Sequence, residues 1–219
     1  MKLRVDLHIH SRYSLATSKN LTPESLDYWA NVKGLSVIGT GDASHPAWLS
    51  ECETKLEQDA GGLYVLRKEY RGEFSRSSGL ASDRSGEPVR FILSAEVSTI
   101  YRKDGRVRKV HHLILLPDFE AARSFQRLLS RVGNITSDGR PILGLDSRDL
   151  LEIVLTASDR AILIPAHIWT PWFSTLGDKS GFDSIDACYG DLASHITAVE
   201  TGLSSDPPMN WCCSFLDRF

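Results

Sequence analysis

The sequence LRVDLHI, residues 3–9, alternates in character and is rich in branched side chains. This pattern predicts a β-strand. A helix is predicted next at about residues 23–33, because Thr22 can cap its first turn and Gly34 suits its C-terminal end. The run LSVIGTGD, residues 35–42, then predicts a second strand that ends in turn residues. The chain therefore begins with strand, helix and strand in succession.

The alternation continues along the chain. Asp104 and Gly105 lie between two β-rich runs, 90–101 and 107–116, and a DG pair in that setting predicts a hairpin. Residues 59–90 are polar and are predicted to be the least regular stretch. The other predicted elements are helices at about 46–58, 118–132, 147–157, 183–193 and 207–217 and strands at 161–168 and 195–203. This order predicts a parallel α/β sheet or barrel, in which reactive residues gather at the C-terminal ends of strands.

The amino-acid composition limits the classes of protein to which this chain can belong. A chain of 219 residues can form one large domain, and 42% hydrophobic with 24% charged residues is ordinary for a globular protein. A net charge of −3 does not exclude nucleic acid, because a local basic stripe is enough to bind it. The four cysteines lack CxxC spacing, no apolar run suits a membrane span, and the N-terminus soon turns polar. We therefore expect a soluble cytoplasmic protein with reduced thiols.

Imidazoles and carboxylates gather near the ends of the predicted strands. His8 and His10 are two residues apart, so the period of a strand places them on one face, where both can hold one ion. The other candidates are Asp42, His45, Glu96, His111, His167 and Glu200. A lone His-x-His pair is a weak signal, whereas several strands converging on one barrel mouth give a much stronger one. Imidazole and carboxylate together favour zinc, manganese or iron.

Some of these polar residues also have a structural interpretation. His112 must point away from His111 on a strand, which favours packing over metal binding. His195 precedes a predicted strand and is interpreted as structural. For His45 a site role and a structural role are evenly balanced. Glu200 is a metal ligand, a partner of a ligand, or part of a strand-end salt bridge.

Several longer motifs resemble the polymerase-and-histidinol-phosphatase (PHP) family of phosphoesterases. They are DLHIHSRYS (6–14), GTGD (39–42), SAEVS (94–98), KVHHLIL (109–115) and IPAHIWTPW (164–172). Others are similar to endonuclease Q: ATSKNLTPESL (16–26), GTGDASHPAWL (39–49), SDGRPILGLDSRDLLEIVL (137–155), IPAHIWTPWFS (164–174), KSGFDSI (179–185) and AVETGLSSDPPMNW (198–211). The resemblance implies a distorted (β/α)7 barrel and a DNA-repair endonuclease that cleaves 5′ to uracil or hypoxanthine and at abasic sites.

The resemblance also implies a ligand set for two divalent ions, which would be zinc, manganese or magnesium. His8 and His10 would bind the first ion, His111 and His167 would hold the second, and Glu96 would bridge the two. Two such ions would activate water and neutralise the scissile phosphate.

Asp42 would orient a ligating histidine, the usual task of a carboxylate beside a metal site. Together with His10 and Glu96 it makes up the expected catalytic set. Residues 15–16 and the residue after Asp42 differ from the ligands that serve a third ion in many PHP proteins. We therefore expect two ions, unless His45 substitutes for a missing ligand.

The family's Ser-Asp-Ala-His motif, whose aspartate should complete the first metal site, would lie beyond Phe219. The resemblance thus implies that residues 1–219 form a single PHP domain that is truncated before its last strand. It also implies that the family's C-terminal DNA-binding domain is absent. Unpaired strand edges invite pairing, so another chain or segment is expected to complete the barrel.

The expected partner is DNA that contains deaminated bases. Trp169 and Trp172 could stack on a flipped base, although packing at the top of the barrel is an equal alternative. The predicted phosphate contacts are Arg102, Lys103, Arg106, Arg108, Lys109 and Arg140. Such a hairpin tip is often simply solvated. The alternative functions are a small-molecule phosphatase of the histidinol-phosphate kind and a catalytically inactive fragment.

Overall fold

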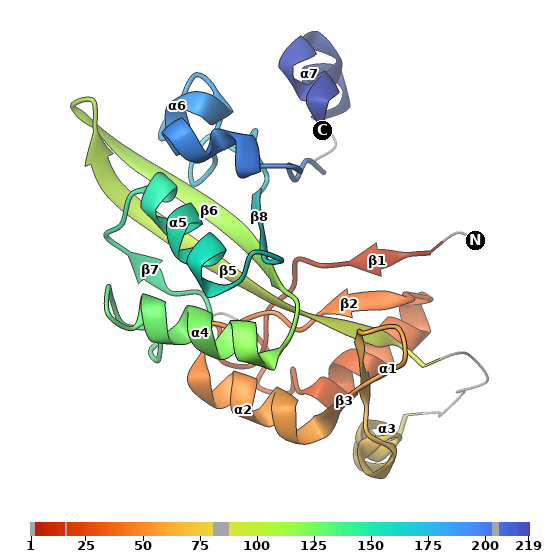
Figure 1. Cartoon of the computed structure of the whole chain (residues 1–219). Coiled ribbons are helices and arrows are strands. Elements are labelled where there is room, and N and C mark those ends of the chain that lie inside the picture. The colour runs from red at the N-terminus through yellow and green to blue at the C-terminus, as the bar shows by residue number, and fades with distance from the viewer. Residues whose placement is uncertain (1–2, 16, 81–87, 203–205) are drawn as a thin grey trace.

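The computed structural model describes residues 3–15, 17–80, 88–202 and 206–219, and these fold around one curled, open sheet (Figure 1). Strand β1 (Val5–Asp6) pairs in parallel with β2 (Val37–Gly39), which pairs in parallel with β5 (Arg90–Lys103). The start of β5 also pairs antiparallel with β4 (Tyr64–Leu66), and β4 with β3 (Leu56–Gln58). The sheet therefore has a mixed first half.

The second half of the sheet is built on a long hairpin. Residues 93–103 of β5 pair antiparallel with β6 (Arg106–Leu116), and β6 pairs antiparallel with β8 (Ile162–Pro165). Strand β7 (Ile142–Leu143) runs parallel to β5. The DG hairpin is confirmed, but the prediction of a parallel sheet is wrong for this half. A two-residue turn reverses the chain, so β5 and β6 can only be antiparallel neighbours.

Four helices lie close to where the sequence predicts them. They are α1 (Pro23–Lys33), α2 (Pro46–Lys55), α4 (Phe119–Leu129) and α5 (Ser147–Ala157). The Thr22 side chain accepts the Ser25 N–H at the start of α1, and Gly34 ends that helix with a φ of 67°. Asp118 caps α4 by accepting the Ala121 N–H. Local capping signals therefore set most helix ends.

Other predictions are wrong in detail. The helix predicted to reach residue 58 ends three residues earlier, and its last turn is replaced by β3. The stretch 59–90 contains β4, α3 (Glu73–Ser78) and a short 3-10 helix at Lys68–Tyr70, and residues 81–87 of it lie outside the described residues. The predicted helix at 183–193 is divided into α6 (Ile185–Tyr189) and a 3-10 helix, Gly190–His195. The last predicted helix becomes α7 (Asp206–Cys212) and a 3-10 helix, Ser214–Arg218.

The predicted strand at 195–203 does not form within its described part, up to residue 202. This segment makes only isolated bonds with the end of β8: the Glu200 N–H donates to Pro165, and the Ile168 N–H donates to the Glu200 carbonyl. Two bonds tie it beside β8 without a regular ladder. The apolar alternation gives the segment its extended path, and the missing ladder partners prevent a strand.

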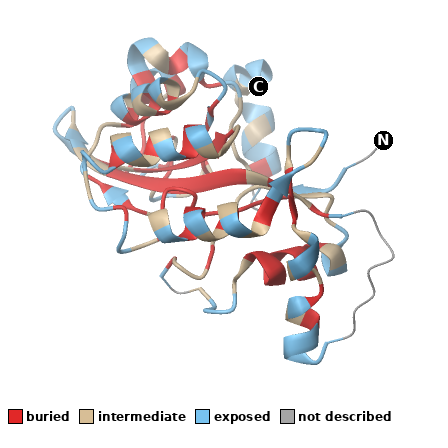
Figure 2. Ribbon diagram, turned by 60° about the horizontal axis from the view of Figure 1, so that its bottom comes forward, coloured by how far each residue is buried: buried red, intermediate tan, exposed pale blue. Residues whose placement is uncertain are grey.

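The core lies between the sheet and the helices that cover it, as the buried central strands in Figure 2 show. Helices α4 and α5 pack against each other, and Phe125 and Leu150 are fully buried there. The helix predicted to reach residue 132 ends at Leu129, and the side chain of Val132 is 41% exposed. No helix in the described parts of the chain has the length and apolar character needed to cross a membrane.

Candidate metal centre

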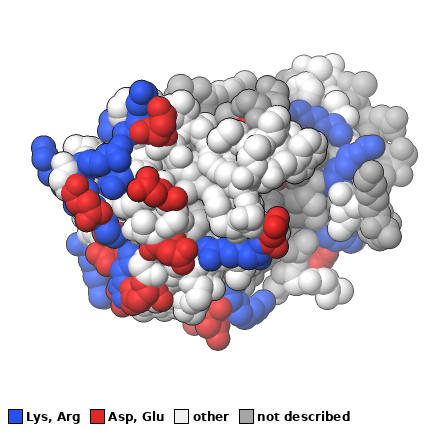
Figure 3. All heavy atoms as spheres, turned by 90° about the horizontal axis from the view of Figure 1, so that it is seen from above, with Lys and Arg blue, Asp and Glu red and all other residues white. Residues whose placement is uncertain are grey.

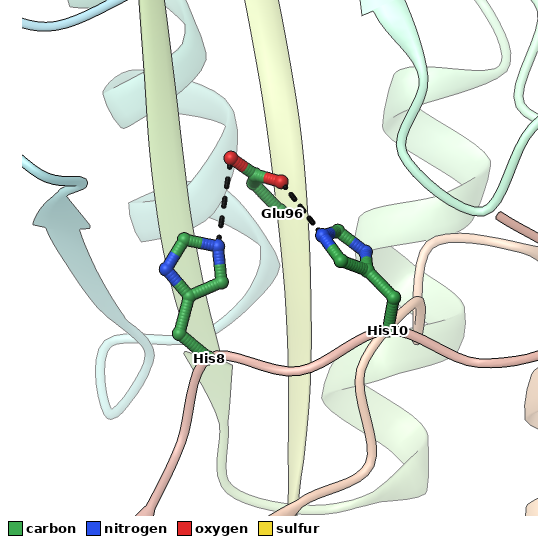
Figure 4. Close-up of side chains that lie close together, drawn as sticks. All are labelled: His8, His10 and Glu96. Atoms are coloured by element: carbon green, nitrogen blue, oxygen red, sulfur yellow. Dashed lines mark ion pairs between the residues drawn. The ribbon is translucent and has the colours of Figure 1, made fainter. Parts of the chain in front are cut away.

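Glu96 lies on β5 at the centre of a cluster of histidines and is only 2% exposed. His8 and His10 follow β1 and point at it from one side (Figure 4). His8 Nε2 lies 3.5 Å from Glu96 Oε1, and His10 Nε2 lies 3.1 Å from Glu96 Oε2. The two carboxylate oxygens therefore face different imidazoles.

Two further histidines approach the same carboxylate from the other half of the sheet. His111 Nδ1 is 2.7 Å from Glu96 Oε1, and His167 Nε2 is 3.8 Å from that oxygen. His111 on β6 pairs with Ser98, two residues from Glu96 on β5, so the two side chains share one face. His167 follows β8 and has a φ of 32°, a conformation that non-glycine residues rarely adopt.

The strand register explains why residues distant in sequence meet. Val5 pairs with Val37, and Val37 with Arg90, so the segments that follow β1 and β2 reach the level of Glu96. The register places the HxH pair and Asp42 beside the middle of β5. The centre therefore depends on strand pairing as well as on the motifs.

Asp42 holds one of the ligand candidates in place. It is fully buried, and its Oδ1 lies 3.0 Å from His10 Nδ1. Its Oδ2 accepts the Ser11 N–H at 2.7 Å and the Ser14 hydroxyl at 2.9 Å. The φ of Asp42 is 50°, in the left-handed region. The histidine that Asp42 contacts is thus His10, in line with the orienting role that the resemblance implies for this carboxylate.

Glu200 holds the imidazole ring of His8 in place, as Asp42 holds that of His10. Its carboxylate oxygens lie 2.8 and 2.9 Å from His8 Nδ1, and one of them also accepts the His167 N–H at 2.8 Å. Of the roles left open for Glu200, the contacts favour that of a partner of a ligand. Thr170, whose hydroxyl lies 2.9 Å from His167 Nδ1, plays the same part for His167. Sequence reasoning missed Thr170, although its position three residues after His167 is a usable signal.

The cluster is electrostatically polarised. Burial alone would lower the pKa of His8, but the hydrogen bonds to Glu200 and Glu96 outweigh it and raise that pKa to about 10. His10 responds in the same way to Asp42 and Glu96, and its pKa rises to about 9. Burial alone would raise the pKa of Glu96, but hydrogen bonds from the surrounding imidazoles hold it well below its usual range. The site thus keeps a buried carboxylate ionised through its imidazole neighbours.

This arrangement suits metal ions. Two groups of side chains could each hold one: the first ligand group is His8, His10 and Glu96, and the second ligand group is Glu96, His111 and His167. Within each group the ligand atoms lie within 4.8 Å of one another. Ligands of a tetrahedral zinc ion, at about 2.0–2.1 Å from it, are about 3.3 Å apart. The imidazole nitrogens lie 2.7–3.8 Å from the Glu96 oxygens, which brackets that value.

A buried ring nitrogen supports the same conclusion. His111 Nδ1 lies close to Glu96 Oε1 but not in the direction that a hydrogen bond needs, and no other described residue accepts one from it. Burial lowers the pKa of His111, which keeps its imidazole neutral. A buried ring nitrogen without a hydrogen-bond partner, beside an ionised carboxylate, fits the role of a metal ligand. Imidazole and carboxylate together fit zinc, manganese or iron.

The remaining histidines lie outside both ligand groups. His45 caps α2 by accepting the Trp48 N–H, and its Nε2 lies 3.0 Å from the Thr136 carbonyl oxygen, so both ring nitrogens have backbone partners. His112 is fully buried and lies 2.9 Å from the Tyr189 hydroxyl, which confirms core packing. His195 is exposed on the 3-10 helix after α6.

The predicted DNA contacts fall into different environments. Arg108 is only 6% exposed, bonds to the Gly181 carbonyl and lies 4.1 Å from the Phe182 ring, so its prediction as a surface phosphate contact is wrong. Arg102 and Arg106 are exposed, whereas Lys103 pairs with Asp146 at 3.2 Å. Arg106 lies on the same face of β6 as Arg108, so strand alternation does not separate them. Arg108 is buried because the segment at Gly181 and Phe182 packs against it.

Two aromatic side chains near His167 also differ. Trp169 donates its indole N–H to Asn210 at 2.7 Å and is half-buried, whereas Trp172 is 52% exposed. Lys109 Nζ lies 5.1 Å from the Trp172 ring and 5.3 Å from the Phe173 ring, and Phe173 packs on His111. Of the two tryptophans, Trp172 has the more accessible ring, and it lies beside a cation.

Comparisons with known proteins agree with this geometry. No family model matches the chain. Over 172 residues, 78% of this chain, it is 33% identical to an uncharacterized protein of Methanocaldococcus jannaschii, and it covers 17% of that relative. The crystal structure of the lesion-specific endonuclease PfuEndoQ from Pyrococcus furiosus is similar over 93% of this chain, with a TM-score of 0.70 and 31% identity. A complex of endonuclease Q with a 27-mer duplex that has an abasic lesion at its active site is similar over 92%, with a TM-score of 0.70 and 32% identity.

The chain covers 43% of each of these endonuclease Q chains. The likeness nevertheless covers 92–93% of this chain. The open sheet matches the incomplete barrel that the motifs predict. The chain is therefore a PHP-like domain with an incomplete PHP-type barrel, related to endonuclease Q.

Proposed function

We propose that this chain carries the metal centre of a DNA endonuclease that cuts 5′ to uracil or hypoxanthine and at abasic sites. One observation carries the proposal. Two ligand groups share the buried Glu96 in a chain that is 31–32% identical, over 92–93% of its length, to endonuclease Q. The substrate of one of those structures is a duplex with an abasic lesion. The extension to deaminated bases rests on the resemblance of the motifs.

His8 and His10 with Glu96 would hold one divalent ion, and His111 and His167 with Glu96 a second. The chemistry that such ions supply when bound is neutralisation of phosphate charge and activation of water. The protein's own contribution is to fix the ligands. Each carboxylate partner accepts a hydrogen bond from the Nδ1–H of one ring, so the opposite Nε2 of that ring is left free to bind a cation.

Asp42 and Glu200 perform this task for His10 and His8. Both carboxylates are themselves held by backbone N–H groups, Asp42 by Ser11 and Glu200 by His167. The orientation of each ring is therefore set by groups that cannot easily move. A preorganised ligand set of this kind lowers the cost of binding an ion.

Trp172 and Lys109 are the residues best placed to meet the nucleic acid. Trp172 is exposed beside Phe173, which packs on the ligand His111. An exposed ring there could stack on an unpaired base while Lys109 binds a phosphate. The hairpin tip contributes less, because acidic side chains offset part of its charge: Lys103 pairs with Asp146, and Arg108 lies 3.9 Å from Asp104. Figure 3 shows basic and acidic side chains intermixed at the left end of the face that it draws. Arg102 and Arg106 remain the exposed cations of the tip.

The proposal is tested by nicking of a labelled duplex that contains one deoxyuridine, one deoxyinosine or one abasic site, with added Mn²⁺, Mg²⁺ or Zn²⁺. We expect a metal-dependent nick at the lesion that is lost in Glu96→Gln. The matched control is His195→Ala, which removes an exposed histidine outside the site. A lesion-independent nick, or one that survives Glu96→Gln, would reject the proposal. Release of phosphate from small monoesters without any nick would point to a small-molecule phosphatase instead.

A further inference from the structure

One cation lies inside the metal centre without a full set of partners. Arg140 Nη1 is 3.4 Å from Glu96 Oε2, longer than the roughly 2.7–2.9 Å of a strong charge-assisted hydrogen bond. Its Nε is buried, and no described residue accepts a hydrogen bond from it. The Arg140 side chain is nevertheless 38% exposed. The guanidinium is therefore reachable from solvent, and among the described residues Glu96 is the acceptor that faces it.

The loop that carries Arg140 is fixed from both sides. Its Gly139 N–H donates to the Tyr13 carbonyl at 3.0 Å, and the Ser98 N–H of β5 donates to the Pro141 carbonyl at 2.9 Å. The Asp138 carboxylate accepts the N–H groups of Leu15 and Arg140. The position of Arg140 is therefore fixed, because the backbone of its loop is hydrogen-bonded to the segment that follows the HxH pair and to β5.

Two further contacts hold this loop against the ligands. A Cβ on Gly139 would lie 2.3 Å from Asp42 Oδ2, so only glycine allows the loop to come this close. The bond between His45 and the Thr136 carbonyl anchors the start of the loop. His45 is therefore a positioning residue for the loop.

Glu96 does not need Arg140 for neutralisation, because histidines already surround it. Once divalent ions occupy the ligand groups, the Arg140 cation would face like charge unless an anion lies between them. A guanidinium fork matches a phosphate group through two parallel hydrogen bonds. We infer that Arg140 binds the phosphate group that undergoes cleavage, beside Glu96. The inference rests on the proposed function, and it separates Arg140 from cations that contact flanking phosphates.

The test measures binding as well as activity. Mn²⁺ is titrated by calorimetry into the wild type, Arg140→Gln, Arg140→Lys and the control Arg131→Gln, and inorganic phosphate is then titrated into each Mn²⁺-loaded protein. Arg131 is exposed and lies just after α4. We expect Arg140→Gln to bind Mn²⁺ as tightly as the wild type or more tightly. Its Kd for phosphate should rise by about 10-fold to 100-fold. Arg140→Lys should lie between the two, and Arg131→Gln should match the wild type.

Phosphate binding that is unchanged in Arg140→Gln overturns the inference. So does weaker Mn²⁺ binding in that variant, because it would mean that Arg140 only supports the ligands. Competition by a short oligonucleotide and by a 5′-mononucleotide identifies whether a diester or a monoester uses the site. A wild type that binds phosphate through Arg140 but does not nick DNA rejects only the proposed function. Equal nicking by wild type and Arg140→Gln rejects only this inference.

Discussion

Asp42→Asn is the substitution that most directly tests how the centre is held. Asparagine tolerates the left-handed φ of 50° at this position and nearly matches the carboxylate in shape. The asparagine amide, however, can present either its oxygen or its NH2 group to Ser11 and Ser14, and the other group then faces His10. The wild-type Oδ2 accepts from Ser11 and Ser14, and the Oδ1 faces His10.

The magnitudes decide which way the amide turns. Aiming the NH2 group at the Ser11 and Ser14 donors would leave buried donors unsatisfied, at about 1–3 kcal/mol for each. We therefore expect the amide oxygen to keep those donors and the NH2 group to face His10 Nδ1. His10 must then accept at Nδ1 and carry its proton on Nε2, the atom that faces Glu96. A protonated Nε2 cannot bind an ion, so the affinity for Mn²⁺ should fall by about 10-fold to 100-fold.

Calorimetric titration of Mn²⁺ measures this loss, with the exposed Asp178→Asn as the matched control. Thermal unfolding in EDTA should show only a small change for Asp42→Asn, because the amide keeps its donors. If Asp42→Asn binds Mn²⁺ as tightly as the wild type, Asp42 does not set the tautomer of His10. The same holds if the affinity falls only because the metal-free protein unfolds.

Three further changes have defined outcomes. Mn²⁺ at 100 times its Kd should raise the free energy of unfolding by about 2.7 kcal/mol per site, measured by denaturant titration, and EDTA or Glu96→Gln should abolish the gain. Trp172→Ala should weaken binding of lesion-containing DNA by about 1–3 kcal/mol in fluorescence anisotropy, whereas Trp29→Ala, which removes an exposed ring on α1, should not. Phe125→Ala empties a fully buried position and should lower the free energy of unfolding by about 3–5 kcal/mol, whereas the exposed Val132→Ala should change it by less than about 0.5 kcal/mol. Equal effects of Trp172→Ala and Trp29→Ala would contradict a DNA contact at Trp172, and equal effects of Phe125→Ala and Val132→Ala would contradict the difference in burial between those two residues.

Local signals were sufficient for a large part of the fold. Caps at Thr22 and Asp118 and the turn at Asp104 and Gly105 were all readable, because each depends on neighbours a few residues away. The spacing of the HxH pair placed both imidazoles on one face for the same reason. The grouping of those imidazoles around Glu96 came from resemblance to a family. Spacing alone could not supply it.

Only the tertiary structure decided the rest. Whether Arg108 meets solvent or Phe182 depends on an irregular segment far along the chain, and the place of Arg140 beside Glu96 depends on a loop tied to two other segments. The antiparallel pairing of β6 with β8 and the absence of a strand at 195–202 likewise depend on contacts between segments that are distant in sequence. Propensity and periodicity describe a residue's immediate neighbours. Burial, strand pairing and the partner of a charged group are set by contacts between distant segments, which form only when the whole chain packs.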